Sequence, residues 1–465
     1  MDDPFSSWYA KQLPAGGKGG PVPNTWDFFT LSHDDSSSTN IEEEHIIVDN
    51  INQWAGQISH SPSPGVDVLF ARHKNCTAQI RYLCQPLEST QFETIFKKLS
   101  LPAQYFYLRG MAGVHCNAYT CQTHRDINGK VSHVSVIIRI GFAKSKRCGM
   151  TWSVALTWNA QTNRTVGFIE GFSATDMSEL KFHIKSCLRN LNHPLMLPEI
   201  LLHMITVKLN DQDRVPCEDD FYAEEQRTGI SNMPNPINHA SVWAWSLQDF
   251  KDVTTKANRC LTNMVFLERR FRFTTELTRR FVSLLAELSN DEQVRKIVYE
   301  TEDQLRQRLL NRMWQLEAYV HQTECVQKRM DNLNTVLYTA LSQIDSKNQS
   351  KLARINLQIA QAVRSETIPM RTIAYVTLAF LPGALIAAIF GMNFFQFDAS
   401  TNELVIAKTF WHYWAVTIPV TLVVIACWNV WNYHEKRKGP GDSKVVSILD
   451  EKLDVNELDM DARNV

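Results

Sequence analysis

The sequence predicts an N-terminal α/β domain, then a long helical region and a C-terminal pair of membrane-spanning helices. Three observations predict this order. Short β-branched runs separated by turns precede residue 171, and proline is absent between Pro236 and Pro369. Two long runs without Asp, Glu, Lys or Arg, Thr372 to Phe390 and Phe410 to Tyr433, follow. Each run is long enough to cross the ~30 Å hydrocarbon core of a bilayer.

Composition limits the function classes. The formal net charge is −1 over 465 residues, so the overall charge gives no indication of nucleic-acid binding. The start, Met1-Asp2-Asp3, lacks a basic region followed by an apolar core and predicts no secretory signal. The 10 cysteines have no regular spacing, which favours a reduced, cytosolic domain.

The first segment, residues 1–44, combines Pro, Gly, Ser and Asp without apolar periodicity, and we expect it to be disordered. Residues 45–238 are the predicted cytosolic α/β domain. Within it, Val66 to Phe70 predicts a strand and Thr90 to Lys98 a helix.

Three further runs predict an antiparallel meander, because each is short, strand-like and joined to the next by a turn. They are Val131 to Phe142, Thr151 to Trp158 and Thr165 to Ile169. Helical patterns resume at about Asp176.

Residues 239–371 form the predicted helical region and stalk. Asn290-Asp291 predicts a turn, and Gln293 to Thr323 predicts a second helical run. A third helix is expected from about Val326 to Phe390, roughly 95–100 Å long, because an apolar stripe at helical spacing continues into the first span. The stripe consists of Leu333, Leu337, Leu341, Ile344, Leu352, Ile355, Ile359 and Val363.

The membrane hairpin divides into a first span at 372–390, an outer loop at 391–409, a second span at 410–433 and a cytosolic tail at 434–465. Positive charge lies outside the two spans and the loop between them is mainly acidic, so both termini are expected in the cytoplasm. The residues are Arg364, Arg371, Lys436, Arg437 and Lys438, against Asp398, Glu403 and Lys408 in the loop. A buried pair of globular helices is the alternative.

The two spans differ in composition. Small residues in the first span permit close helix approach and favour an inner position: Ala374, Ala379, Gly383, Ala384, Ala387 and Ala388. Aromatic residues at both ends of the second span favour an outer, lipid-facing helix: Trp411, Tyr413, Trp414, Trp428, Trp431 and Tyr433. Two helices cannot enclose a pore, so conduction requires several copies of the chain.

Gly391-Met392-Asn393, at the outer end of the first span, resembles the motif of the CorA superfamily of magnesium channels. The resemblance implies a CorA-like homopentamer that passes divalent cations passively. The chain departs from the family at Phe390, where bacterial members commonly have Tyr, and in the outer loop, where only Asn402-Glu403-Leu404 echoes the family segment. Where the family has acidic stalk residues this chain has Asn348 and Asn356, with Asp345 and Glu366 the nearest substitutes.

A ring of Asn393 side chains would read a hydrated Mg²⁺, which gives up its water reluctantly. Gly391 would let the helix end turn, and Met392 would pack behind the ring. Asn393 could instead only cap the helix. Counting back by helical turns gives a possible pore face, hereafter the pore face: Met370, Ile373, Thr377, Leu381 and Ala384.

Each pore-face residue could instead serve helix packing, and Thr377 could bond its own backbone. Pro382 is expected to loosen the helix. Asp398 and Glu403 are candidates for attracting ions to the outer loop.

Other groups of residues give weaker indications of function. His115, Cys116, Cys121 and His124 do not match a zinc finger or ribbon spacing, so reduced thiols are expected there. An arginine cluster at helical spacing is expected to be a solvated face with ion pairs: Arg269, Arg270, Arg272, Arg279 and Arg280. Neither a Gly-x-Ser-x-Gly nor a Walker A signature is present, so an enzyme is not expected.

The expected function is passive transport of a divalent cation, with magnesium first and zinc, cobalt or nickel left open. No cofactor is expected. The expected partners are further copies of the chain, the lipid bilayer and the transported ion, with no nucleic acid. The alternative is a non-conducting, membrane-anchored regulatory or partner-binding protein that keeps the same hairpin.

Overall fold

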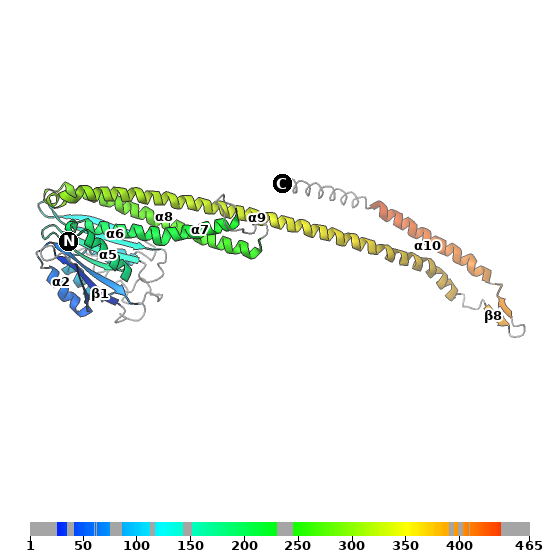
Figure 1. The fold of residues 1–465 in the computed structure, drawn as a ribbon. Coiled ribbons are helices and arrows are strands. Elements are labelled where there is room, and N and C mark those ends of the chain that lie inside the picture. The colour runs from blue at the N-terminus through cyan, green and yellow to red at the C-terminus, as the bar shows by residue number, and fades with distance from the viewer. Residues whose placement is uncertain are drawn as a thin grey trace. The chain divides into compact units, whose positions relative to one another are not determined.

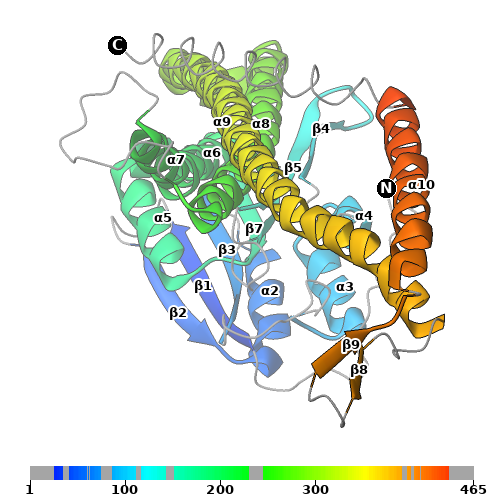
Figure 2. The ribbon, with the colours of Figure 1, turned by 90° about the vertical axis from the view of Figure 1, so that its right-hand side faces the viewer.

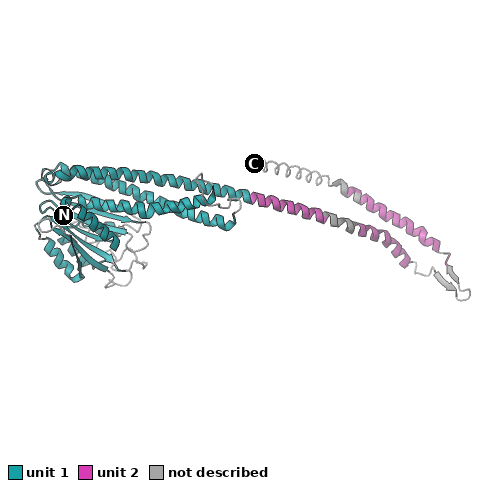
Figure 3. Ribbon diagram, in the orientation of Figure 1, with its two compact units in different colours: residues 1–344 teal, residues 345–465 magenta. Residues whose placement is uncertain are grey.

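The computed structural model describes residues 26–34, 41–59, 61, 63–74, 86–111, 117–142, 151–229, 245–389, 395–398, 403–408 and 410–438. The chain divides into two compact units, 1–344 and 345–465 (Figure 3). The first unit contains an α/β domain and paired long helices. The second contains a helix pair joined through a short β-hairpin.

A seven-stranded sheet in the order β2-β1-β3-β7-β6-β5-β4 organises the first unit (Figure 1). The β3–β7 pair is parallel, and the other neighbouring pairs are antiparallel. The strands are β1 (Trp26–Asp34), β2 (Glu42–Ile46), β3 (Gly65–His73), β4 (Ala118–Arg125), β5 (Val131–Gly141), β6 (Thr151–Asn159) and β7 (Arg164–Glu170).

Helices cover both faces of this sheet (Figure 2). The smaller layer consists of η1 (Val48–Asn50), α2 (Ile51–Ser59), α3 (Ser89–Lys98) and α4 (Gln104–Met111). The larger layer begins with α5 (Ala174–Ser186), η2 (Leu188–Asn190), α6 (Met196–Val207), the π-helical η3 (Lys208–Arg214) and α7 (Val215–Thr228). Because both faces are covered, the central strands are buried on both sides, and β5 and β6 are buried at most of their positions.

The antiparallel meander is confirmed, since β5, β6 and β7 pair in the predicted order. The strand at Val66 to Phe70 and the helix at Thr90 to Lys98 are also confirmed, as β3 and α3. The prediction of disorder for 1–44 is wrong from Trp26 to Asp34, where β1 lies between β2 and β3 with Phe28 and Leu31 buried, and from Glu42 to Glu44, which belong to β2. Residues 1–25 lie outside the described residues.

A buried ion pair fastens the smaller layer to the sheet. Arg109 on α4 donates to Glu170 at the end of β7 at 2.6 Å, and the Tyr105 hydroxyl donates to the same carboxylate at 2.8 Å. All three side chains are nearly inaccessible to water. Burial raises the pKa of the Tyr105 hydroxyl well above its usual value, so this residue remains a hydrogen-bond donor.

The larger layer holds a buried lysine. Lys208 Nζ lies 2.6 Å from Asp176 Oδ1 and faces the rings of Phe142 and Trp152 at 5.0 and 4.8 Å. Asp176 also completes the capping box of α5 with Ser173. The charge of Lys208 is therefore paired where the π-helical turn begins.

Two long helices follow, α8 (Leu247–Ser289) and α9 (Glu292–Ile389). The predicted turn at Asn290-Asp291 is confirmed, because α8 and α9 break there. The predicted second run, Gln293 to Thr323, and the third helix from about Val326 are one uninterrupted helix, so the separation expected near Thr323 is wrong. Thr323 is fully buried, and its hydroxyl bonds the Val320 carbonyl of the same helix, which explains how a polar residue fits there.

The expected solvated face of arginines is confirmed in part. Arg272 pairs with Glu268 and Glu324, and Arg280 pairs with Glu287. Arg279 approaches Glu317 at 3.8 Å. Arg270 differs, because only 3% of it is exposed and it lies near Asp213 of η3.

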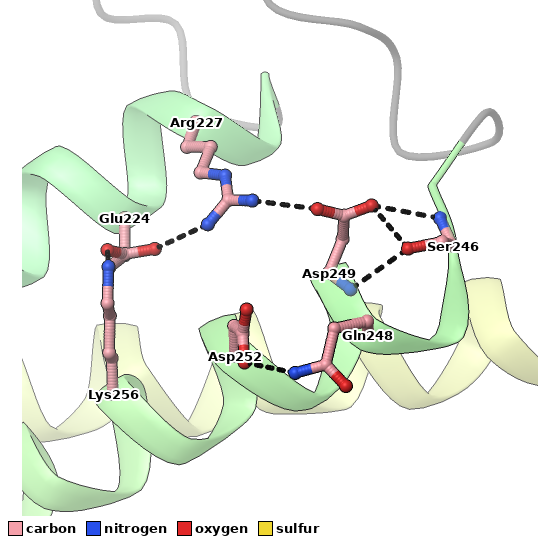
Figure 4. Close-up of polar contacts among 7 residues, drawn as sticks. All are labelled: Glu224, Arg227, Ser246, Gln248, Asp249, Asp252 and Lys256. Carbon is pink, nitrogen blue, oxygen red and sulfur yellow. Dashed lines mark hydrogen bonds and ion pairs between the residues drawn. The ribbon is translucent and has the colours of Figure 1, made fainter.

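Ionic contacts join the end of α7 to the start of α8 (Figure 4). Arg227 contacts Asp249 at 2.9 Å and Glu224 at 3.7 Å, and Lys256 pairs with Glu224. Asp249 in turn forms the capping box of α8 with Ser246. The start of α8 is thus fixed both by its own cap and by α7.

A glycine pair in the α/β domain gives a stability test. Gly171 has φ +92°, and a Cβ there would lie 1.9 Å from the Thr151 carbonyl oxygen, whereas Gly129 has φ +77° and open space. Gly129→Ala should cost about 1–2 kcal/mol, the usual cost of left-handed backbone. Gly171→Ala should lower stability by a clearly larger amount, measured as thermal unfolding of the purified chain. Equal losses in the two variants would contradict the close approach.

A candidate ion pathway in the C-terminal helix pair

Two helices of the second unit are long and apolar enough to cross a membrane. They are the end of α9, Thr372–Ile389, with mean hydropathy 2.0, and the segment Phe410–Trp431 of α10 (Phe410–Lys438), with mean hydropathy 1.7. Only 11% and 6% of these windows are buried. A globular protein buries its apolar helices, so this exposure disfavours the buried globular pair.

The contact between α9 and α10 centres on a glycine. The Tyr413 hydroxyl donates to the Gly383 carbonyl at 3.2 Å, and a Cβ on Gly383 would meet Thr417 Cγ2 at 3.6 Å. Nearer the start of the span, the ring of Tyr375 meets Trp428 edge-on at 4.4 Å. The absence of a side chain at Gly383 therefore allows α10 to pack closely against α9 at this position.

All residues of the predicted pore face are exposed in the single chain. Met370, Ile373 and Leu381 are 72%, 67% and 67% exposed. At about 100° per residue, the pore face occupies roughly 80° of the helix surface. The most covered positions of this part of α9, Leu378, Pro382 and Ile386, lie roughly 100–180° from the centre of the pore face. The structure thus brings the pore-face residues together on the side away from α10.

The same apolar side continues towards the N-terminus of α9. Earlier in α9, Leu333 and Leu337 on this side are buried in the core of the first unit. From Leu352 onwards the side chains that the structure describes on this side are exposed, and we name them the α9 stripe. They are Leu352, Ile355, Ile359, Val363, Met370, Ile373, Thr377 and Leu381. Leu352 and Met370 lie 18 positions apart, about five turns, so they share one side of the helix.

The structure describes the surroundings of Thr377, a member of the pore face, and of Pro382. The Thr377 hydroxyl donates to the Ile373 carbonyl one turn earlier, which is the backbone bond considered for it. Pro382 lies inside α9, which continues to Ile389, and its side chain is buried. Its place on the covered side makes it a packing residue within the pair.

The loop between the helices forms a small β-hairpin. Its strands are β8 (Phe395–Asp398) and β9 (Glu403–Ile406). The register places Asp398 directly opposite Glu403, and like charges in opposite positions destabilise a strand pair. Sequence reasoning missed this pairing, although the alternation Phe-Gln-Phe before a short turn could have predicted it. Gly391, Met392 and Asn393 lie outside the described residues.

The aromatic residues of α10 play two roles. Trp411, Trp414, Trp431 and Tyr433 are exposed at the two ends of the helix, 74%, 43%, 71% and 60% respectively. Tyr413 and Trp428 instead contact α9. Two of the six aromatic residues at the ends of the second span therefore serve the contact between the helices.

Other candidates for metal binding are placed as follows. His115 and Cys116 lie outside the described residues. Cys121 is buried, which raises the pKa of its thiol to about 12, and the odd spacing puts His124 on the other face of β4. Asp345, Asn348 and Asn356 are exposed, and nothing is described of the Glu366 side chain. Within the described ranges, no group of three or more His, Cys, Asp or Glu could hold a metal ion.

The chain is similar to a curated protein over a short segment and to a solved structure. No family model matches the chain. A segment of 70 residues is 41% identical to notoamide biosynthesis cluster protein M' of Aspergillus versicolor and spans 15% of each chain. Among solved structures, the chain is similar to the cytoplasmic domain of ZntB from Vibrio parahaemolyticus, with TM-score 0.34 and 10% identity. That likeness covers 66% of this chain and 98% of the other.

The α9–α10 contact yields a substitution test. Gly383→Leu should force α10 away, because the space opposite accepts only a Cβ-sized group. Gly383→Ala should be tolerated at this contact. We expect the leucine variant to lower the melting temperature of the detergent-solubilised protein by several degrees.

Cys427→Leu supplies the matched control, since it adds bulk to an exposed position of α10. Equal stability of Gly383→Leu and Cys427→Leu would show that the glycine contact does not hold the pair together.

Proposed function

We propose that the chain assembles into a homo-oligomeric pore for passive transport of a divalent cation, with magnesium as the expected ion. The observation that carries the proposal is the uncovered α9 stripe. It includes four apolar side chains between the first unit and the span, Leu352, Ile355, Ile359 and Val363, that are 50–59% exposed.

Burial of these side chains would be favourable. Fully burying one large aliphatic side chain stabilises by about 1.5–3 kcal/mol, so each copy gains several kcal/mol when neighbouring copies cover the stripe. The stripe passes into the pore face without changing sides of the helix. Copies that meet along it would therefore arrange the pore-face residues around one axis, as in the pentamer that the CorA resemblance implies.

Charge supports an orientation with both termini in the cytoplasm. Basic residues flank the spans on the side of the termini, and the connecting loop carries Asp398 and Glu403 against Lys408. The Gly391-Met392-Asn393 segment then faces the opposite compartment. A cation entering from that side would first encounter the paired carboxylates of the β8–β9 hairpin, whose mutual repulsion a divalent cation relieves.

Asn393 is the proposed selectivity residue. Amide oxygens from several copies would accept hydrogen bonds from the water shell of Mg²⁺, which spares the cost of dehydration. The transport is driven by membrane potential, and the proposal includes no cofactor, no enzymatic step and no nucleic-acid partner.

A flux assay tests the pore. Wild-type protein in liposomes should pass Mg²⁺ down an imposed potential, measured with an encapsulated magnesium-sensitive dye. Asn393→Ala should abolish this flux, because the amide ring is lost. Gln396→Ala, which removes an amide from β8 three positions away, should retain it.

Undiminished flux in Asn393→Ala would remove the selectivity role. Absence of flux with Mg²⁺, Zn²⁺, Co²⁺ and Ni²⁺ alike would instead support the non-conducting, membrane-anchored alternative.

The outer carboxylates make a separate prediction. The double variant Asp398→Asn, Glu403→Gln should reduce flux severalfold at low Mg²⁺ and low salt, where surface charge concentrates cations. At high salt, where charges are screened, its flux should approach that of the wild type. A reduction that does not depend on salt would argue against electrostatic attraction. Lys408→Gln, which removes the basic side chain of the loop, should have the opposite sign.

A further inference from the structure

Two histidines of the α/β domain form a pair that the proposed pore does not use. His124 on β4 and His133 on β5 are direct partners in the strand register. Their rings are stacked, with centroids 4.1 Å apart and planes 14° from parallel. Both side chains are half-buried at the edge of the sheet.

Hydrogen bonding fixes which nitrogen of His133 carries the proton. The Ser132 hydroxyl donates its single hydrogen to the His124 carbonyl at 3.1 Å. The contact of 3.0 Å between Ser132 Oγ and His133 Nδ1 must therefore be donated by the imidazole. Neutral His133 then has a lone pair on Nε2, and that nitrogen has no protein partner within the described residues.

His124 has a matching arrangement. Its Nε2 lies 3.1 Å from Ser135 Oγ, which leaves Nδ1 as its second nitrogen. Each imidazole thus has one nitrogen held by a serine hydroxyl and one remaining. Histidines that bind metals generally use one nitrogen for the ion and donate the other N–H to an oxygen, which sets the ring orientation.

The electrostatic surroundings keep both rings neutral. Burial lowers the pKa of both imidazoles, to about 4 for His133, and the neighbouring ring lowers that of His133 further. Each neutral ring carries one lone pair, on Nε2 of His133 and, where the Nε2–H of His124 donates to Ser135 Oγ, on Nδ1 of His124. The guanidinium of Arg125 donates to the Gly129 carbonyl and to Asp291, and adjacent strand positions point to opposite faces.

We propose that His124 and His133 form a binding site for a borderline transition-metal ion such as Zn²⁺, Ni²⁺ or Cu²⁺. The ion would bind His133 Nε2 and His124 Nδ1, with water filling the other positions. Two nitrogens that each lie ~2.1 Å from one ion are separated by roughly 3.4 Å in a tetrahedron and at most ~4.2 Å in a line. The ring centroids lie 4.1 Å apart, but the lone pairs of stacked rings lie in nearly parallel planes. Binding therefore requires the two side chains to rotate out of the stack until both lone pairs converge on the ion.

The ligand chemistry separates this site from the proposed cargo. Imidazole nitrogen suits Zn²⁺, Ni²⁺ and Cu²⁺, whereas Mg²⁺ requires oxygen ligands. The site therefore responds to a different class of ion than a hydrated-magnesium pore. It lies in the first unit and does not rest on the proposed function.

Calorimetric titration of the purified full-length chain with Ni²⁺ tests the proposal, with Cu²⁺ and electron paramagnetic resonance to detect nitrogen ligands. Wild-type protein should bind one more ion per chain than the double variant His124→Gln, His133→Gln. Ser132→Ala should keep both ligands but weaken binding roughly 10- to 100-fold, because the support of the His133 tautomer is lost.

His45→Gln is the matched control, since His45 is an exposed histidine of another edge strand, and it should bind as the wild type does. Asn393→Ala should also leave this site unchanged, so failure here and failure of the pore are distinguishable.

A measurement on unaltered protein covers the case in which the double variant misfolds. Zn²⁺ should protect His124 and His133 from carbethoxylation, read by mass spectrometry, while His45 stays reactive. Mg²⁺ should give no protection. An unchanged stoichiometry in a folded double variant, or no selective protection by Zn²⁺, would overturn the proposal.

Discussion

One constraint organises the C-terminal half of the chain: a single helix carries an apolar side that its own fold covers only in part. Down to Ile344 that side packs against the core of the first unit. From Leu352 it is uncovered, although it keeps the same spacing into the apolar span. Exposure of such an apolar surface to water is unfavourable. The role of the pore face therefore depends on what covers the α9 stripe.

Local periodicity allowed much of the fold to be predicted. The meander β5–β7, the break at Asn290-Asp291 and the two apolar helices each depend on residues that are close in sequence. The strand β1 could not be predicted this way, because its partners β2 and β3 supply the pairing that stabilises it. The sequence analysis divided α9 near Thr323, but this residue is buried within the helix and its hydroxyl bonds the Val320 carbonyl of the same helix.

In the candidate site, too, local spacing predicted some residues, whereas others depend on contacts between distant parts of the chain. Helical spacing sufficed to place Met370, Ile373 and Leu381 on one side of α9. Pairings across strands did not follow from spacing, because register depends on the turn and on the opposite strand. The Asp398–Glu403 and His124–His133 pairs are both of this kind. Arg270 is a further example, since its burial near Asp213 of η3 depends on tertiary packing and does not follow from helical spacing.

The Asp291 side chain connects α9 to the sheet. Its carboxylate accepts the Val294 backbone N–H at the start of α9, the Val131 N–H of β5 and a contact from Arg125 of β4. One buried anion thus joins the first turn of the longest helix to the hairpin between β4 and β5. The first turn of α9 is therefore coupled to the sheet. If it tilts, either the ends of β4 and β5 must move with it or these three contacts to Asp291 must break.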